Sequence, residues 1–210
     1  MKPHTPAEFI GKTGVIARAM FAQVPKLKDA VDPMQRRYLF TGDAGLGKTA
    51  LAEALAAAIT GDPIERVWAG KSFNVEQVNG QSCSVDLVRR WQAEAHYVPM
   101  NSKVIIVDEI DATSLAACNE LRTYLDKLPP KWVFLATTNL AVRKLQPQLQ
   151  SRFKVHFFEN VPHETIAHWL CARFKLGLDL ARQTARNSGG NVRAAETDAL
   201  NLIETLQALA

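Results

Sequence analysis

The sequence predicts an α/β fold with a mostly parallel sheet, followed by a small domain built of helices alone. Short apolar runs, rich in β-branched and aromatic residues, alternate with helical patterns as far as about residue 160. The first of these runs leads through a glycine-rich turn into a helical pattern, and beyond Pro162 every pattern is helical. We therefore expect one domain over residues 1–160 and an all-α domain over residues 161–210.

Five runs are candidate strands of the sheet. Residues 104–107 and 132–136 are continuously apolar, which is typical of strands that are covered on both faces. Residues 38–40 form a shorter run that ends at the glycine-rich turn. Weaker candidates lie at residues 73–78 and 155–158.

Helical patterns fill the intervals between these strands. Residues 49–59 are rich in Ala and Leu and stop at Gly61, which suits a helix C-terminus. Residues 84–95 place apolar side chains at helical spacing and begin with Ser84, a favourable N-cap. A third pattern covers residues 113–127. Three further helices make up the predicted second domain: residues 163–174, 178–187 and 192–209.

Composition restricts the class of protein. The chain has 210 residues, of which 47% are hydrophobic and 22% charged, values that suit a globular protein and exclude a disordered one. Its three cysteines are widely spaced, which argues against a disulfide framework or a zinc site and favours a reducing compartment. There is no apolar signal segment and no membrane-length apolar run, so we expect a soluble cytoplasmic protein. The net charge of +4 is compatible with a phosphate-bearing partner.

Residues 42–49, Gly-Asp-Ala-Gly-Leu-Gly-Lys-Thr, match the phosphate-binding pattern G-x-x-x-x-G-K-[ST] and lie between a predicted strand and a predicted helix. Glycines let backbone N–H groups turn toward phosphates, and the start of the next helix adds its positive dipole end. We expect Lys48 to reach the β- and γ-phosphates of ATP and the Thr49 hydroxyl to bind Mg²⁺. The loop glycines expected to hold the nucleotide are Gly42, Gly45 and Gly47.

A pair of carboxylates follows the strand predicted at residues 104–107. Asp108 is expected to complete the Mg²⁺ site, and Glu109 to position or activate the attacking water. Asp111 has two open interpretations, an approach to the next helix N-terminus or a direct role in the site. After a phosphate loop, an apolar strand that ends in Asp-Glu is a strong indication of nucleotide hydrolysis.

With these motifs in order, the sequence resembles the AAA+ ATPases, and within them the clamp-loader clade of replication factor C small-subunit type. The resemblance runs over roughly residues 9–202. It implies a P-loop NTPase domain with a five-stranded parallel sheet of order 5-1-4-3-2, and a small all-α lid. Besides the phosphate loop, the segments that carry the resemblance are Phe-Ile-Gly-Lys at 9–12, Asn-Gly at 79–80, Thr-Thr-Asn at 137–139, Leu-Gln-Ser-Arg-Phe at 149–153 and Gly-Gly-Asn-Val-Arg at 189–193.

The resemblance implies roles for four residues. Asn139 would contact the γ-phosphate or the water, and Asn79 would hold Glu109 inactive until a partner binds. Arg152 would act as an arginine finger in the neighbouring subunit's ATP site, and Arg193 would bind phosphate within the same chain. Arginine suits these tasks because it stays charged and its planar fork matches charge spread over oxygens. The alternatives are that Asn139 is only a turn residue and that Arg152 is a surface ion-pair residue, which is the better interpretation of Arg152 when it is taken alone.

The sequence departs from the clamp-loader pattern in three places. The phosphate loop, Gly-Asp-Ala-Gly-Leu-Gly, lacks the proline that is common in the family. Phe153 stands where the clade usually has Cys, a change that we expect to concern packing. The chain ends at Ala210, where the collar domain of clamp loaders would begin. We therefore expect assembly through the ATPase domains rather than through a collar, and the sequence leaves open whether the chain is part of a longer protein.

Arg89 and Arg90 are candidate contacts to a DNA backbone. They lie on the helix after the second predicted strand, which faces DNA in clamp loaders. Phosphate contacts of this kind would be independent of DNA sequence. A solvated helix face explains the same two residues equally well, and Trp91 beside them is expected to lie in the core.

Two functions remain open on the sequence. The first is an ATP-binding and ATP-hydrolysing clamp-loader-like protein of DNA replication or repair, whose partners are copies of itself or homologous AAA+ subunits, the DNA backbone, and a sliding clamp or another replication protein. The alternative is a nucleotide-gated assembly factor on DNA, a replication-initiation helper or transposition regulator, in which hydrolysis only resets the oligomer. A protein-threading motor is less favoured, because residues 79–84 are short and polar where a pore loop would be aromatic.

Overall fold

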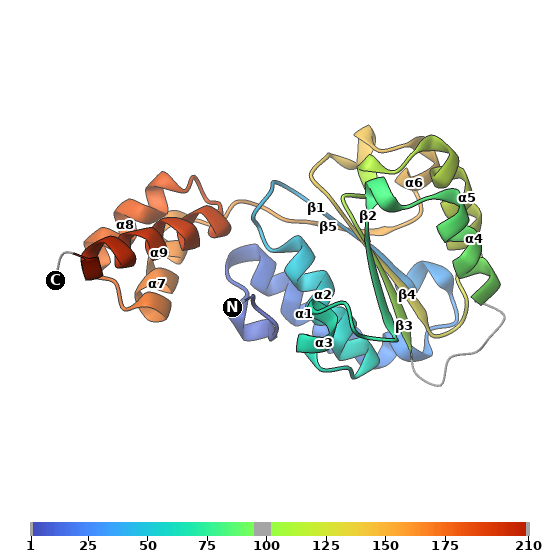
Figure 1. Cartoon of the computed structure of the whole chain (residues 1–210), viewed down its shortest axis with the longest axis horizontal. Coiled ribbons are helices and arrows are strands. Elements are labelled where there is room, and N and C mark those ends of the chain that lie inside the picture. The colour runs from blue at the N-terminus through green and yellow to red at the C-terminus, as the bar shows by residue number, and fades with distance from the viewer. Residues whose placement is uncertain (1, 95–101, 209–210) are drawn as a thin grey trace.

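The computed structural model describes residues 2–94 and 102–208 (Figure 1). Its strands are β1 Arg37–Thr41, β2 Val75–Asn79, β3 Lys103–Asp108, β4 Trp132–Thr138 and β5 Lys154–Phe157. Its α-helices are α1 Gly11–Asp29, α2 Lys48–Thr60, α3 Ile64–Trp68, α4 Val85–Glu94, α5 Leu115–Asp126, α6 Pro147–Gln150, α7 His163–Phe174, α8 Leu178–Asn187 and α9 Val192–Ala208. Two predicted helix ends, Ala95 and Leu209, lie outside the described residues.

The sheet confirms the predicted topology. All strand pairs are parallel and the order is β2-β3-β4-β1-β5, which is the expected order counted from the opposite edge. The register pairs Asn79 with Asp108 and Thr41 with Thr138, so the carboxyl ends of four strands meet at one edge. In open parallel sheets this edge is where ligands bind.

The two faces of the sheet carry separate cores. Tyr38, Val104 and Val133 point to the face covered by α1, α2 and α3 (Figure 1). Their neighbours along the strands, Leu39 and Ile105, point to the face covered by α4, α5 and α6. The period of two along each strand places successive side chains on opposite faces, and because both faces are covered at the centre of the sheet, β3 and β4 are apolar along most of their length.

Helix α1 has no counterpart among the helices predicted from the sequence. It begins at Gly11 and contains Gly14 and Pro25, residues that weaken an isolated helix. A Cβ on Gly14 would lie 2.3 Å from the carbonyl oxygen of Phe9, so the glycine permits a close chain crossing. The helix packs against α2 through buried apolar side chains such as Met20, and this packing supplies the stability that its composition lacks.

Strand β2 begins two residues later than predicted. The Ser72 hydroxyl accepts hydrogen bonds from the backbone N–H groups of Asn74 (3.1 Å) and Val75 (3.0 Å), forming a turn where the sequence indicates a strand. The Phe73 side chain is exposed as a result. The local side-chain bond therefore competes with the sheet ladder at this end of the strand.

Helices α7, α8 and α9 form a cluster beside the sheet domain (Figure 1). They share a buried apolar core that includes Ile166, Leu170 and Ala195, and Ile10 from the N-terminal segment packs against it. The boundary predicted near residue 160 falls in the segment between β5 and α7. Within the described residues, no helix is both long and apolar enough to cross a membrane.

Candidate functional site

The phosphate loop, residues 42–49, connects β1 to α2 at the carboxyl edge of the sheet. Gly42, Gly45 and Gly47 have φ angles of 143°, 79° and 89°, conformations that side chains with a Cβ rarely adopt. A Cβ on Gly42 would also lie 2.3 Å from the carbonyl oxygen of Phe158, so the loop passes directly over the end of β5. These positive φ angles explain why the motif has glycine at these three positions.

Lys48 is the first residue of α2, and its side chain is buried in the loop. Its ammonium donates hydrogen bonds to the carbonyl oxygens of Gly42 and Asp43, each at 2.7 Å, and to Asn139 Oδ1 at 2.8 Å. Burial lowers the pKa of Lys48, and the carboxylate of Asp108 opposes that shift. The ammonium therefore lies where an anionic ligand would stabilise its charge.

Thr49, Asp108 and Thr137 form a cluster of oxygen atoms next to Lys48. The Thr49 hydroxyl donates to Asp108 Oδ1 at 2.8 Å, and the Thr137 hydroxyl donates to the same oxygen. Hydroxyl and carboxylate oxygens are ligands that Mg²⁺ prefers, usually with several waters or phosphate oxygens completing its shell. The Thr49 hydroxyl and the Asp108 carboxylate therefore fit a Mg²⁺ ion that also binds phosphate oxygens.

Glu109 follows Asp108 in a left-handed conformation, with φ 54° and ψ 52°. The Asn79 amide donates to Glu109 Oε2 at 3.2 Å, and Asn79 Oδ1 accepts from the backbone N–H of Gln81 at 2.9 Å. The pairing of β2 with β3 brings Asn79 beside Asp108. The structure thus brings together the asparagine and the glutamate whose contact the resemblance implies.

The predicted lid, which comprises α7, α8, α9 and the segments between them, contacts the phosphate loop directly. Asn191 Nδ2 donates to the Ala44 carbonyl at 3.0 Å, and the backbone N–H of Arg193 donates to the Gly45 carbonyl at 3.3 Å. Sequence reasoning missed the contact made by Asn191. The signal available was its position before α9, where Asn191 Oδ1 caps the helix by accepting from the Ala194 N–H at 3.1 Å.

A cavity of about 700 Å³ lies between the sheet edge and the lid. Its lining combines polar and charged side chains with apolar and aromatic ones, which suits the phosphates and the base of a nucleotide. The polar and charged lining residues include Lys48, Thr49, Asp108, Glu109, Asn139 and Arg193. The apolar and aromatic ones include Phe9, Ile10, Trp169 and Leu200, of which the first two belong to the segment predicted to pass near the adenine.

Arg152 does not line this cavity in the described structure. It follows α6 and forms an ion pair with Asp126, whose Oδ2 lies 3.2 Å from Arg152 Nη2. Within one chain, Arg152 is therefore an ion-pair residue, and a role in another subunit's site depends on assembly.

The two DNA candidates are also paired with carboxylates. Arg89 contacts Glu120 at 3.1 Å, and Arg90 contacts Glu76 and Glu94. Both arginines are exposed on α4. Trp91 is completely buried, as predicted from the sequence.

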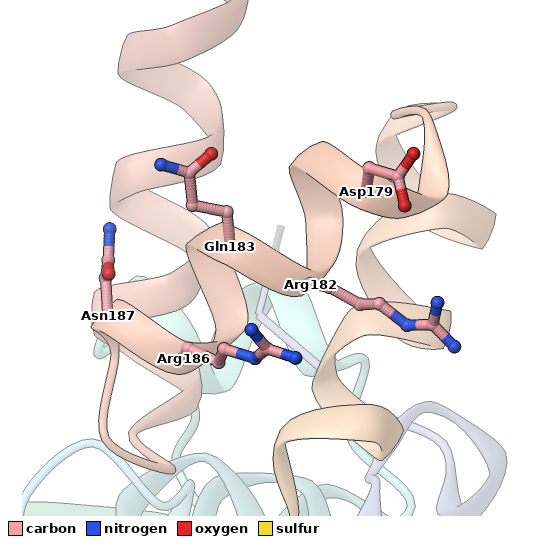
Figure 2. A pocket seen from close by; sticks show the side chains of 5 residues that line it. All are labelled: Asp179, Arg182, Gln183, Arg186 and Asn187. Carbon is pink, nitrogen blue, oxygen red and sulfur yellow. The ribbon is translucent and has the colours of Figure 1, made fainter.

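A second hollow, of about 380 Å³, lies on the exposed surface of α8. Figure 2 shows that its lining side chains fan out from this helix instead of converging on one point. Arg182 turns toward α7, where it contacts Glu164 at 3.2 Å. The hollow is lined by Asp179, Arg182, Gln183, Arg186 and Asn187, and it offers no convergent set of groups for a ligand.

A glycine-rich loop between a parallel strand and a helix, a buried lysine within it and a carboxylate at the end of β3, with β4 between β3 and β1, define a P-loop nucleotide-binding protein. Residues 38–161 match the sequence profile of the ATPase family associated with various cellular activities (AAA), and the chain belongs to this family. The membership predicted from the motifs is confirmed.

The chain is similar to replication factor C subunits. It is 31% identical over 170 residues to the replication factor C small subunit of Archaeoglobus fulgidus, a match that covers 79% of this chain and 49% of that one. It is 27% identical over 175 residues to replication factor C subunit 3 of Saccharomyces cerevisiae, covering 81% and 49%. The chain thus spans about half the length of these relatives. The predicted clamp-loader-like character is confirmed.

Solved structures support the fold. The RuvB Holliday junction branch migration motor of Thermotoga maritima superimposes with a TM-score of 0.76 at 17% identity, covering 99% of this chain and 67% of that one. Domain III of the replication initiation protein DnaA from the same organism gives a TM-score of 0.68 at 16% identity, covering 98% and 90%. At these identities the likeness concerns the fold alone.

Proposed function

We propose that this chain binds and hydrolyses ATP as a clamp-loader-like AAA+ protein of DNA replication or repair, and that it works as an oligomer. The observation that carries the proposal is the convergence of Lys48, Thr49, Asp108, Glu109 and Asn139 on one cavity beside the lid. The similarity to replication factor C small subunits supports a role in DNA replication or repair.

Binding of ATP rests on three parts of the chain. Backbone N–H groups of the phosphate loop and the Lys48 ammonium would hold the β- and γ-phosphates. Arg193 would approach them from the lid, whose backbone already contacts Gly45. Thr49 and Asp108 would hold Mg²⁺, which neutralises phosphate charge when bound.

Hydrolysis needs an oriented water and stabilisation of the charge that develops on the phosphate. Glu109 would accept a proton from the water as the water oxygen attacks the γ-phosphorus and the bond to the bridging oxygen of ADP breaks. Asn139 would contact the γ-phosphate or the water, and the neighbouring subunit would supply Arg152 to the γ-phosphate. The contact between Asn79 and Glu109 supports a resting state in which Glu109 is held until a partner binds.

Assembly would use copies of this chain or homologous AAA+ subunits. DNA would be held through its backbone, with phosphates replacing Glu120 and Glu76 as partners of Arg89 and Arg90. A sliding clamp or another replication protein would be the object on which the assembly acts.

The first test measures phosphate release by the purified protein, with and without primed DNA, next to native mass with and without a non-hydrolysable ATP analogue. We expect ATP-dependent assembly and turnover that DNA stimulates. The Glu109→Gln variant should assemble with the analogue yet release phosphate at least about 100-fold more slowly. Absence of turnover under all these conditions, or equal turnover by Glu109→Gln, would contradict the proposal.

The alternative, a nucleotide-gated assembly factor on DNA, is favoured by one observation. The cavity is lined by a full set of nucleotide-binding groups within one chain, whereas Glu109 is held by Asn79 and Arg152 does not line the cavity. A chain of this kind can bind ATP well and hydrolyse it poorly. DNA-bound assemblies of Glu109→Gln that keep their full output would favour this alternative, and loss of output would favour the clamp-loader-like cycle.

A further inference from the structure

We propose that Asp126 is the positioning residue for Arg152, holding the guanidinium in the orientation in which it enters the neighbouring subunit's ATP site. The inference rests on the proposed function, because it requires that Arg152 act in trans. Asp126 was not among the residues selected from the sequence, and it lies 26 positions before Arg152 in the chain.

The contact involves one edge of the guanidinium. Asp126 Oδ2 accepts from Arg152 Nε at 3.4 Å and from Arg152 Nη2 at 3.2 Å. The other carboxylate oxygen, Oδ1, accepts from Arg37 Nη1 at 3.3 Å. The Arg37 side chain, on β1, is only 8% exposed, so its position is fixed by packing. Its ion pair therefore restrains the Asp126 carboxylate relative to the sheet. Arg152 is therefore held through Asp126 by the central part of the fold.

The position of Asp126 is electrostatically unfavourable without such partners. It is the last residue of α5, where the negative end of the helix dipole disfavours a carboxylate. Two arginines, Arg37 and Arg152, compensate this charge. The two ion pairs thus offset the unfavourable interaction of the Asp126 carboxylate with the helix dipole.

The remaining edge of the guanidinium is available for phosphate. Arginine has five N–H donors in a planar fork, and the contact with Asp126 uses the side that carries Nε and one terminal nitrogen. Nη1 contacts the Ser151 hydroxyl at 3.4 Å, and Ser151 itself is exposed. A phosphate oxygen can replace the serine while Asp126 keeps its bonds.

The backbone on the other side of Arg152 is also anchored. Phe153 is buried and its ring lies 6.0 Å from that of Phe134 on β4. With the backbone and one edge of the guanidinium both held, little conformational entropy remains to be lost when the finger meets its phosphate. Such preorganisation acts on the transition state, so it should change kcat and leave ATP binding unchanged.

The test uses mixtures of variants of the whole chain. Arg152→Ala keeps the nucleotide-binding groups but has no finger, whereas Glu109→Gln keeps its finger but lacks the residue that prepares the water. Mixing these two variants should restore turnover at interfaces where a Glu109→Gln subunit supplies its Arg152 to the ATP site of an Arg152→Ala subunit. In the decisive mixture, Glu109→Gln is replaced by the double variant Glu109→Gln/Asp126→Asn.

We expect the double variant to restore turnover about tenfold less well, with an unchanged KM for ATP. The variant Glu109→Gln/Asp126→Glu, which keeps a carboxylate, should recover part of the loss. The matched control is Glu109→Gln/Glu120→Gln, which removes a charge from the same helix that pairs with Arg89 instead. In mixtures with Arg152→Ala, this control should restore the same turnover as the single variant Glu109→Gln.

The outcomes separate this inference from the proposed function. If Arg152→Ala and Glu109→Gln do not complement each other, the trans finger itself fails, and the inference fails with it. If the double variant complements as well as Glu109→Gln, Asp126 does not position the finger, although the proposed function stands. If the double variant also loses binding of an ATP analogue, Asp126 serves the fold and the inference is overturned.

Discussion

The Lys48 ammonium donates a hydrogen bond to Asn139 Oδ1 at 2.8 Å, which joins the phosphate loop to the segment that follows β4. Together with the bonds to the carbonyls of Gly42 and Asp43, this contact uses all three donors of the ammonium. A phosphate that binds Lys48 must therefore replace at least one of these partners. Asn139 is the one side-chain partner among the three, and its release from Lys48 would leave its amide free to face the γ-phosphate.

Asn139→Ala should separate binding from turnover. Lys48 keeps its two carbonyl partners, so the Kd for a fluorescent ATP analogue should change by less than about threefold, whereas loss of a group that contacts the transition state should lower kcat about 100-fold. Fluorescence titration and phosphate release measure the two quantities. Asn187→Ala, at the exposed end of α8, is the control. Equal losses of affinity and turnover would show that Asn139 acts in binding.

Asn79→Asp should raise basal turnover. Aspartate can still accept from the Gln81 N–H, but it cannot donate to Glu109 and it repels that carboxylate. Release of one hydrogen bond of about 1 kcal/mol corresponds to about a fivefold increase in phosphate release without DNA. The control Gln81→Glu adds the same charge two positions along the chain. Unchanged or lower basal turnover in Asn79→Asp would contradict the restraint on Glu109.

Two glycines with the same φ offer a matched test of the lid contact. Gly45 and Gly61 both have φ 79°, but a Cβ on Gly45 would lie 2.0 Å from Asn191 Oδ1, whereas nothing lies within 4 Å of one on Gly61. Gly61→Ala should therefore cost only backbone strain, about 1 kcal/mol in urea unfolding, with ATP affinity unchanged.

Gly45→Ala adds a clash between the phosphate loop and the lid to the same strain. We expect it to weaken binding of an ATP analogue at least about tenfold, since the lid segment must move away from the loop. Removing the opposing side chain, in Gly45→Ala/Asn191→Gly, should recover part of that affinity. Equal affinities of the Gly45→Ala and Gly61→Ala variants would exclude a role for this contact.

His156 should make stability depend on pH. Its ring stacks on Tyr38, with centroids 5.9 Å apart, and burial lowers its pKa below the ordinary value of 6.5, with a further contribution from Lys154. As pH falls through 6.5, the unfolded chain binds a proton before the native one does, so the free energy of unfolding decreases down to the lowered pKa.

Urea unfolding at a series of pH values below 7 measures this contribution. The slope of unfolding free energy against pH should be smaller in His156→Gln than in the wild type. Parallel curves for His156→Gln and the wild type would contradict the predicted effect.

Much of the fold follows from local patterns in the sequence. Residues 104–107 and 132–136 are apolar at every position because both faces of the sheet are covered, and this was visible without a structure. The phosphate loop and Asp108 were visible as well, because glycine spacing and a carboxylate at a strand end are local signals. Helix α1 was missed because its stability comes from packing on α2 rather than from its own residues.

By itself, the sequence determined the order of the elements, the family and the groups that would handle phosphate. Tertiary structure alone decided which distant residues meet: Asn191 contacts Ala44 from 147 positions away, Lys48 contacts Asn139 from 91, and Arg152 is held by Asp126 from 26. The physical reason is that strand and loop motifs are encoded by neighbouring residues, whereas these contacts depend on how sheet, helices and lid pack in three dimensions.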